Sequence, residues 1–333
     1  APAPPSATQR QPFRASLLQE DLRQANLRTN PKAEGNRGLE DRRLKQAISA
    51  LDSLGELELM EANRAATRLI LRGTTVEGLP DWDGGQDRAV HFIDWDHPEN
   101  NTFRVVNRFR VDEPSGEPGD YIVPDLVLFV NGIPLVVIEC VSPTTVDPLG
   151  EALTQLQRYS NRRDGVEHDE GNERLFHYTQ IMVATCFEKA VAGTVGSRAA
   201  DYLEWKDTSP VPMDYVATSL GKERLSSQEV LVAGMLRPDL LLDIVRNFTL
   251  FRAEAGTVLK IIPRYHQFRA VRLAVQRLHE GLTTFFSHLQ GFLQQKSGTE
   301  ESRGQLAHID QFFGHLADLA EALRAAGMSP PEV

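Results

Sequence analysis

The clearest hydrophobic pattern in the chain lies in residues 126–138. Residues 126–130 and 135–138 are two apolar runs rich in β-branched side chains, and Asn131-Gly132 lies between them. Because glycine accepts a positive φ without steric cost, an Asn-Gly pair between two such runs predicts a tight hairpin of β-strands. Both faces of both runs are apolar, which is typical of a central, covered pair of strands.

Other segments show the spacing of helices and strands around this hairpin. Apolar residues recur at helical spacing on both sides of Gly55, and Gly73 has the place of a C-cap. From about residue 211 onward the pattern turns helical. The sequence predicts helices over residues 39–54, 57–71, 149–160 and 239–251, and strands over residues 90–94, 103–111 and 180–185.

Composition and charge restrict the class of protein. The chain has 333 residues, of which 41 % are hydrophobic and 25 % are charged, as is usual in soluble globular proteins. It has no apolar run of about 18 residues, and its start lacks the pattern of a signal peptide. The formal net charge of -10 argues against a free-standing, high-affinity DNA-binding protein, but not against a nuclease that a motor or partner subunit delivers to DNA.

The two cysteines indicate the compartment. Cys140 and Cys186 both lie in apolar runs, which favours small buried side chains in a reducing cytoplasm over a disulfide. The chain has no CxxC pair and its histidines are scattered, so no structural zinc site is expected.

Two acidic residues interrupt the apolar pattern of the hairpin. Asp125 opens the first strand, and Glu139 closes the second strand fourteen residues later. The two side chains face each other if the loop holds an odd number of residues, and a three-residue loop over residues 131–133 would satisfy this condition. Burying two negative charges together is costly. One interpretation is a capped strand end with a solvated Asp125 and an arginine-paired Glu139. The other is a site for a divalent cation such as Mg²⁺.

Pro124-Asp125, Glu139 and the position two residues further on resemble the signature of PD-(D/E)xK nucleases. The longer string over residues 123–139, VPDLVLFVNGIPLVVIE, is similar to the N-terminal nuclease domain of the restriction (R) subunit of type I restriction–modification enzymes. Further phrases extend the resemblance to roughly residues 40–280, among them MEANRAATRLILRGTTV, FIDWDHPENNTFRVVNRFRV and LFHYTQIMVAT. The resemblance implies an α/β fold of restriction-endonuclease type, in which helices flank a mixed central sheet, with a helical C-terminal extension.

The resemblance also divides the chain into segments. Residues 1–40 open with a proline-rich, polar stretch and are expected to form a flexible N-terminal arm. Residues 41–210 correspond to the nuclease domain, and residues 211–280 resemble the helical connector that leads into the family's motor domain. Residues 281–333 carry amphipathic helical sequence that does not match the family, and their role is unknown.

In the family, the chemistry is Mg²⁺-dependent hydrolysis of DNA phosphodiester bonds. The resemblance implies that Asp125 and Glu139 hold the metal, with the backbone carbonyl of Cys140 or Ile138 as a further ligand.

Three further residues match positions of the family. Gln155 and Tyr159 stand one helical turn apart and resemble a Gln-xxx-Tyr motif that contacts the DNA backbone or the acidic site. A surface glutamine beside a buried tyrosine is the alternative. Glu61 lies on a predicted helix that often supplies another acidic residue near the metal, although a surface glutamate is the more frequent case at this spacing.

One residue departs from the family pattern. Where the family has a lysine two positions after the glutamate, this chain has Val141. Residues 139 and 141 share one side of a strand, so the missing ammonium group would have faced the metal and the attacking water. The implication is an impaired nuclease, or one whose positive charge comes from elsewhere, such as the nearby Arg158, Arg162 or Arg163. An arginine does not release its proton and would only clamp phosphate.

Two other features were weighed for chemistry. The turn DWDHPENN over residues 94–101 contains Asp94, Asp96 and His97, which are residue types that bind metals, but Asx residues with proline are typical of a tight turn and this structural interpretation is preferred. Gln267, in the phrase YHQ, matches a glutamine that lies near the nucleotide base in the family's motor. Because no GxxxxGK[ST] loop follows, ATP is expected only in a full-length form that contains the motor.

The sequence thus predicts the endonuclease domain of a type I R subunit that uses Mg²⁺ and whose DNA cleavage is impaired by Val141. The alternative is a catalytically inactive module that contacts DNA or docks on other restriction–modification subunits. The expected partners are double-stranded DNA and the methylation and specificity subunits, with no membrane.

Overall fold

The computed structural model describes residues 13–30, 41–78, 84–112, 121–163, 165–166, 169–254 and 257–296. The chain divides into two compact units, residues 1–265 and residues 266–333. Nearly all of helix α10 (Tyr265–Lys296) belongs to the second unit. Within the expected arm, residues 1–12 and 31–40 lie outside the described residues, whereas residues 13–30 include helix α1 (Gln19–Thr29), in which Leu22 and Ala25 are buried. Within the segment over residues 281–333, residues 297–333 lie outside the described residues.

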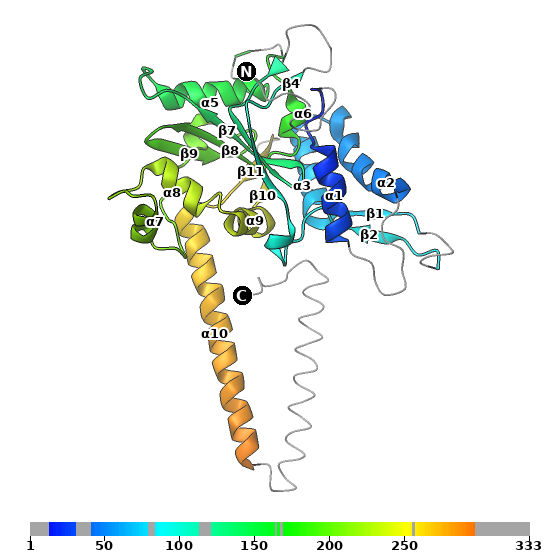
Figure 1. Cartoon of the computed structure of the whole chain (residues 1–333), viewed down its shortest axis with the longest axis vertical. Coiled ribbons are helices and arrows are strands. Elements are labelled where there is room, and N and C mark those ends of the chain that lie inside the picture. The colour runs from blue at the N-terminus through cyan, green and yellow to red at the C-terminus, as the bar shows by residue number, and fades with distance from the viewer. Residues whose placement is uncertain are drawn as a thin grey trace. The chain divides into compact units, whose positions relative to one another are not determined.

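A five-stranded sheet with the strand order β3-β6-β7-β8-β9 forms the centre of the first unit (Figure 1). β7 and β8 run parallel and the other neighbours run antiparallel, so the sheet is mixed. The strands are β3 (Phe103–Asn107), β6 (Leu126–Val130), β7 (Ile133–Cys140), β8 (Ile181–Cys186) and β9 (Lys189–Gly193). This arrangement confirms the expected α/β fold with a mixed central sheet.

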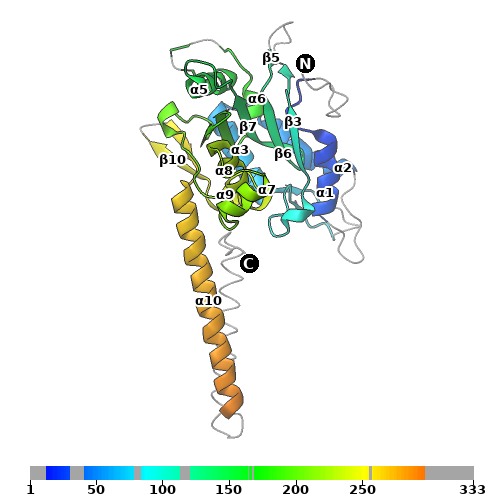
Figure 2. The same ribbon diagram turned by 60° about the vertical axis from the view of Figure 1, so that its left-hand side comes forward.

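Helices lie on both faces of this sheet (Figure 2). On one face, Leu156 of α5 (Pro148–Tyr159) belongs to an apolar cluster with Val137 of β7 and Met182 of β8. The opposite face, which carries Leu126 and Ile138, lies against α7 (Met213–Ser219) and α8 (Ser227–Gly234) around an apolar cavity of about 470 Å³. Period-2 alternation along the strands sends apolar side chains to both layers, which is why the runs are apolar throughout.

The remaining elements surround this core. The helices expected over residues 39–54, 57–71 and 149–160 correspond to α2 (Asp41–Asp52), α3 (Leu59–Arg72) and α5, and Gly73 ends α3 at φ 73° as expected. The other helices of the first unit are α1 (Gln19–Thr29), α6 (Glu173–Phe176) and α9 (Pro238–Asn247), with single turns at η2 (Ser53–Glu56), η3 (Pro98–Asn100) and η4 (Ala199–Asp201). The paired short strands are β1 (Thr74–Val76) with β2 (Arg88–Val90), β4 (Val111–Asp112) with β5 (Tyr121–Ile122), and β10 (Leu250–Glu254) with β11 (Thr257–Ile261).

The turn of the β6–β7 hairpin differs from the expected three-residue loop. Only Asn131 and Gly132 lie between the strands, at φ 52° and 81°, and Ile133 already pairs with Val130. A register shift next to Leu128 absorbs the odd residue inside the ladder instead. A β-bulge therefore does what the longer loop was expected to do, and the acidic residues still come to lie opposite each other.

Three other expectations were wrong. Strand β2 ends at Val90, so residues 91–94 form no strand, and the strand expected over residues 103–111 breaks after Asn107. The helix expected over residues 239–251 ends at Asn247, and β10 (Leu250–Glu254) pairs antiparallel with β11 (Thr257–Ile261) within the segment expected to be helical. The β-branched run Thr257-Val258 and the alternation of β11 favour a strand, and this local signal outweighs the helical composition around it.

Candidate functional site

Asp125 and Glu139 meet at the open end of the β6–β7 hairpin. Leu126 pairs with Ile138, which places the two acidic residues opposite each other one step further on. The backbone N–H of Asp125 donates a hydrogen bond to Oε1 of Glu139 over 3.2 Å. In return, the backbone N–H of Cys140 donates to Oδ2 of Asp125 over 3.0 Å. The expected proximity of the two carboxylates is therefore confirmed, whereas their binding of a metal stays a prediction.

The environment of the pair disfavours two negative charges. Glu139 is 5 % exposed. Burial, and next the negative charge of Asp125, raise the pKa of Glu139 to about 8. Cys140 is exposed, so the expectation of two buried cysteines was wrong for this one. Partial burial, and next the charges of Asp125 and Glu139, raise the pKa of its thiol to about 11. Both shifts have the same cause, which is that the surroundings of the pair oppose further negative charge.

Gln155 and Tyr159 of α5 attach to the chain segment that leads into Asp125. Nε2 of Gln155 donates to the Tyr159 hydroxyl over 2.7 Å, and this hydroxyl donates to the backbone carbonyl of Val123 over 3.3 Å. Burial, and next the charge of Glu139, raise the pKa of Tyr159. The motif pair therefore lies beside the acidic site, and its contact with DNA stays a prediction.

Sequence and packing explain why α5 presents these two side chains. Asp147 caps the helix by accepting a hydrogen bond from the Gly150 N–H, and Pro148 starts the first turn. Ala152, Leu156 and Tyr159 form its buried face, which fixes the rotation of the helix about its axis.

Val141 brings no charge to the site. It is partly buried against the apolar cluster that includes Leu156 and Tyr159, and its backbone N–H donates to the Thr185 carbonyl over 2.9 Å. The position that a lysine would occupy is therefore filled by apolar packing.

A buried lysine elsewhere in the fold does not replace it. Lys260 of β11 is 4 % exposed, and its Nζ donates to Oδ1 of Asn63 over 2.8 Å and to Oε1 of Gln180 over 2.7 Å. Gln180 precedes the first residue of β8, whereas Glu139 pairs with Ala184 near the other end of that strand. Burial holds the pKa of Lys260 well below its usual range. Lys260 thus fastens the β10–β11 hairpin to α3 and β8, at the far end of the sheet from the acidic pair.

Among the residues that the structure describes, Arg108 forms an ion pair with the acidic pair, and the sequence had not singled it out. Its Nη1 lies 3.3 Å from Oδ1 of Asp125. The alternative of a solvated Asp125 and an arginine-paired Glu139 is therefore wrong in its pairing, because Asp125 holds the arginine and Glu139 is buried.

The pattern of apolar residues carried a signal for the strand break at Arg108, although not for its contact with Asp125. Val106 and Phe109 lie in the same cluster although they are three residues apart, an odd spacing that a regular strand does not allow. Arg108 takes φ 52° to make this break. For a residue with a side chain, this backbone region costs about 1–2 kcal/mol.

The other candidates lie on helices α3, α5 and α10 and in the segment after α5. Glu61 is exposed in the first turn of α3, which favours the interpretation as a surface residue. Within the described residues, no group of three or more His, Cys, Asp or Glu side chains is placed to hold a metal ion. Gln267 lies in α10, in the second unit, and its contact with a nucleotide stays a prediction. Arg158 lies over the ring of Tyr159, 5.5 Å from its centroid, and Arg163 pairs with Glu170.

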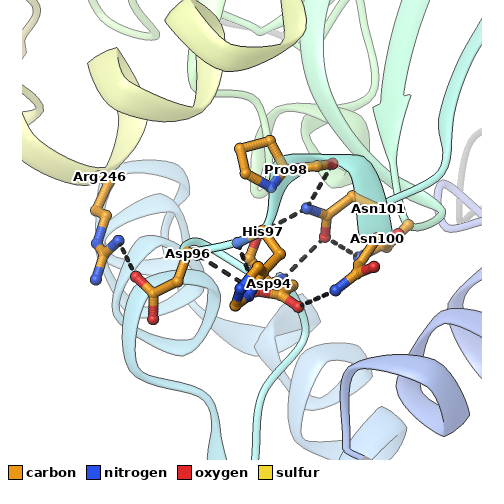
Figure 3. Close-up of polar contacts among 8 residues, drawn as sticks. Asp94, Asp96, His97, Pro98, Asn100, Asn101 and Arg246 are labelled. Carbon is orange, nitrogen blue, oxygen red and sulfur yellow. Dashed lines mark hydrogen bonds and ion pairs between the residues drawn. The ribbon is translucent and has the colours of Figure 1, made fainter. Parts of the chain in front are cut away.

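The turn over residues 94–101 is a hydrogen-bonded structural turn, as preferred from the sequence (Figure 3). Oδ1 of Asp94 accepts the His97 backbone N–H over 3.0 Å, and Oδ2 accepts Nδ2 of Asn100 over 2.8 Å. Burial opposes ionisation of Asp94, but these hydrogen bonds prevail and lower its pKa. Arg246 of α9 pairs with Asp96 over 2.7 Å and ties the turn to the helical segment.

A mixed five-stranded sheet flanked by helices, with two carboxylates at one end of β6 and β7, is consistent with a nuclease-like core. Residues 3–200 match the family described as type I restriction enzyme R protein N terminus, and the chain belongs to this family. None of the described helices combines the length and apolar character needed to cross a membrane.

Two curated relatives are named as endonuclease subunits of type I restriction enzymes. The type I restriction enzyme HindI endonuclease subunit of Haemophilus influenzae is 28 % identical over 263 residues, which cover 77 % of this chain and 22 % of the relative. A putative type I restriction enzyme MjaVIIIP endonuclease subunit of Methanocaldococcus jannaschii is 28 % identical over 197 residues, covering 59 % of this chain and 17 % of the relative. The chain therefore spans about a fifth of the length of the curated relatives it matches.

Proposed function

We propose that this chain is a DNA endonuclease module that hydrolyses phosphodiester bonds with Mg²⁺ at Asp125 and Glu139, and that it does so slowly. The observation that carries the proposal is the meeting of these two carboxylates at the end of β6 and β7. The family and the names of the relatives, which are endonuclease subunits, support it.

The donor set suits a hard divalent cation. Mg²⁺ prefers carboxylate oxygens and keeps several water ligands, so two carboxylates are enough protein charge for a site completed by water and phosphate. The Cys140 carbonyl leaves the strand on the same side as its N–H, which bonds to Asp125, and is the proposed further ligand. A bound metal ion would lower the pKa of a coordinated water and offset the phosphate charge.

The protein residues have separate tasks in this proposal. Asp125 and Glu139 hold the cation. Gln155 and Tyr159 fix the segment before Asp125 and contact the DNA backbone. Val141 supplies no ammonium group to orient the attacking water, and cleavage is slow for this reason.

The proposed partners follow from the family. The substrate is double-stranded DNA, and the net charge of -10 favours delivery by the methylation and specificity subunits over free-standing binding. ATP is a cofactor only of a longer form that contains the motor.

The apolar packing of Val141 favours a second candidate, a catalytically inactive module that contacts DNA or docks on the other subunits. In that case the carboxylate pair is a remnant of a nuclease site.

Plasmid nicking in Mg²⁺ or Mn²⁺ separates the two candidates. We expect slow nicking by the wild-type chain, none by Asp125→Asn or Glu139→Gln, and faster nicking by Val141→Lys. Val141→Met is the matched control for volume without charge. Equal inertness of all variants, with no heat of Mn²⁺ binding by calorimetry, would establish the inactive module.

A further inference from the structure

We infer that Arg108 is a DNA-contacting residue of this site, whose guanidinium binds a phosphate group held at the Asp125–Glu139 pair. The inference rests on the proposed function and names the group that would supply the positive charge. It is carried by the position, backbone conformation and exposure of Arg108.

The position of Arg108 is fixed from two sides. Its backbone N–H donates to the Asp125 carbonyl over 2.8 Å, while its Nη1 approaches Oδ1 of the same residue at 3.3 Å. The next residue, Phe109, donates its N–H to the Pro124 carbonyl over 3.1 Å and packs its ring against Phe129 at 5.0 Å between centroids. The guanidinium therefore stands beside Asp125 on a rigid part of the fold.

The backbone conformation suggests that the side chain itself is required. At φ 52°, glycine or asparagine would be the relaxed choice, yet the chain carries a long cationic residue here. Local strain of this kind is found preferentially at functional sites, where the surrounding structure holds it in place.

Exposure decides what the guanidinium can reach. About half of the Arg108 side chain is exposed, 51 %, compared with 25 % for Asp125. The guanidinium carries five N–H donors in a planar fork that matches two phosphate oxygens. A phosphate that approaches the acidic pair from solvent therefore meets this fork first.

The chemistry open to Arg108 is electrostatic. During hydrolysis a water oxygen bonds to phosphorus while the bond from phosphorus to the leaving oxygen breaks, the water gives up a proton and the leaving oxygen takes one up. Arginine keeps its proton and takes no part in these transfers. It stabilises the negative charge that builds up on the non-bridging oxygens.

Neighbouring arginines are engaged in other contacts. Arg110 pairs with Asp112 and lies over the Tyr121 ring at 4.1 Å from its centroid. Arg104 pairs with Asp21 over 2.9 Å, near the other end of β3. Arg104, on β3, and Arg108, just after it, each pair with an aspartate. Of these two arginines, Arg108 stands at the acidic site and Arg104 does not, so Arg104 is a matched control.

The test compares Arg108→Asn, Arg108→Lys, Arg104→Asn and the double variant Arg108→Asn with Val141→Lys. Asparagine tolerates a positive φ, so the fold is kept while the charge is lost. In single-turnover plasmid nicking we expect Arg108→Asn to be about 100-fold slower, Arg108→Lys to be intermediate, Arg104→Asn to match wild type, and the double variant to recover rate. Near-wild-type nicking by Arg108→Asn would refute the inference and leave the proposed function intact.

A binding measurement keeps the inference testable if the chain does not cut. Fluorescence anisotropy of a short duplex in Ca²⁺ at several salt concentrations reports the number of phosphate contacts, and losing one lowers the slope of log K against log salt by about 0.9. We expect this change for Arg108→Asn and not for Arg104→Asn. An unchanged slope in an inert chain, or no duplex binding at all, would overturn both the inference and the proposed function.

Discussion

Replacing Glu139 by glutamine should make the protein more stable at alkaline pH. The folded chain raises the pKa of Glu139 from 4.5 to about 8, and glutamine removes the ionisation while keeping the oxygen that accepts the Asp125 N–H. Its amide also gives the Asp125 carboxylate a donor in place of a negative charge.

The size of the effect follows from proton linkage. Between pH 4.5 and about 8, folded Glu139 is protonated and unfolded Glu139 is not, so wild-type stability falls as pH rises through this window. Each pH unit is worth roughly 1.4 kcal/mol, and the whole window sums to at most about 5 kcal/mol. Above pH 8 the difference between variant and wild type should stay constant, and below pH 4.5 it should vanish.

Urea unfolding of wild type and Glu139→Gln across this pH range measures the difference directly. Glu151→Gln, at an exposed glutamate on α5, is the matched control for replacing a carboxylate outside the acidic pair. A ligand that binds only the folded state stabilises it. Mn²⁺ should therefore stabilise the wild type, and it should not stabilise Glu139→Gln, which lacks one of the two proposed carboxylate ligands. Parallel pH profiles for wild type and Glu139→Gln would show that Glu139 does not titrate abnormally and that the acidic pair is not strained.

Two further substitutions test the supports of the site. Tyr159→Phe removes the donor to the Val123 carbonyl and leaves the Gln155 amide without its hydroxyl acceptor. We expect the free energy of unfolding in urea to fall by about 1 kcal/mol and nicking to become slower. Unchanged nicking would limit Tyr159 to a role in packing. Lys260→Met removes the donor to Asn63 and Gln180. We expect the free energy of unfolding to fall by about 2–3 kcal/mol and hydrogen exchange in β10 and β11 to become faster, with Mn²⁺ affinity unchanged. A more stable variant would show that burying the amine costs more free energy than its hydrogen bonds contribute.

Much of the sheet could be predicted because its signal is local. The apolar runs of β6 and β8 and the Asn131-Gly132 pair carry strand and turn preferences that tertiary packing reinforces. The opposition of Asp125 and Glu139 was predicted for a partly wrong reason, since the bulge beside Leu128 and not a longer loop sets the register. Hairpin register depends on the number of turn residues plus the number of bulge residues. The sequence pattern indicates whether this total is odd or even, but not whether the extra residue lies in the turn or in a bulge.

Arg108 and Lys260 could not be assigned from the sequence for a different reason. Each is a single basic residue among 36 lysines and arginines, and its role depends on partners distant in the chain. Arg108 meets Asp125 across 17 residues, and Lys260 meets Asn63 across 197. Only the folded arrangement distinguishes such residues from basic residues on the surface.

The location of the positive charge has a kinetic consequence. An ammonium group at residue 141 would stand on the Glu139 side, among the partly buried residues of the apolar cluster, where it would touch the attacking water. Arg108 stands on the more exposed Asp125 side, where it meets phosphate but exchanges no proton. The chain thereby keeps a contact with the DNA backbone but lacks the ammonium group that would orient the attacking water. The chain should therefore lose its rate in the chemical step and not in DNA binding, so Val141→Lys should raise the single-turnover rate more than it changes duplex affinity.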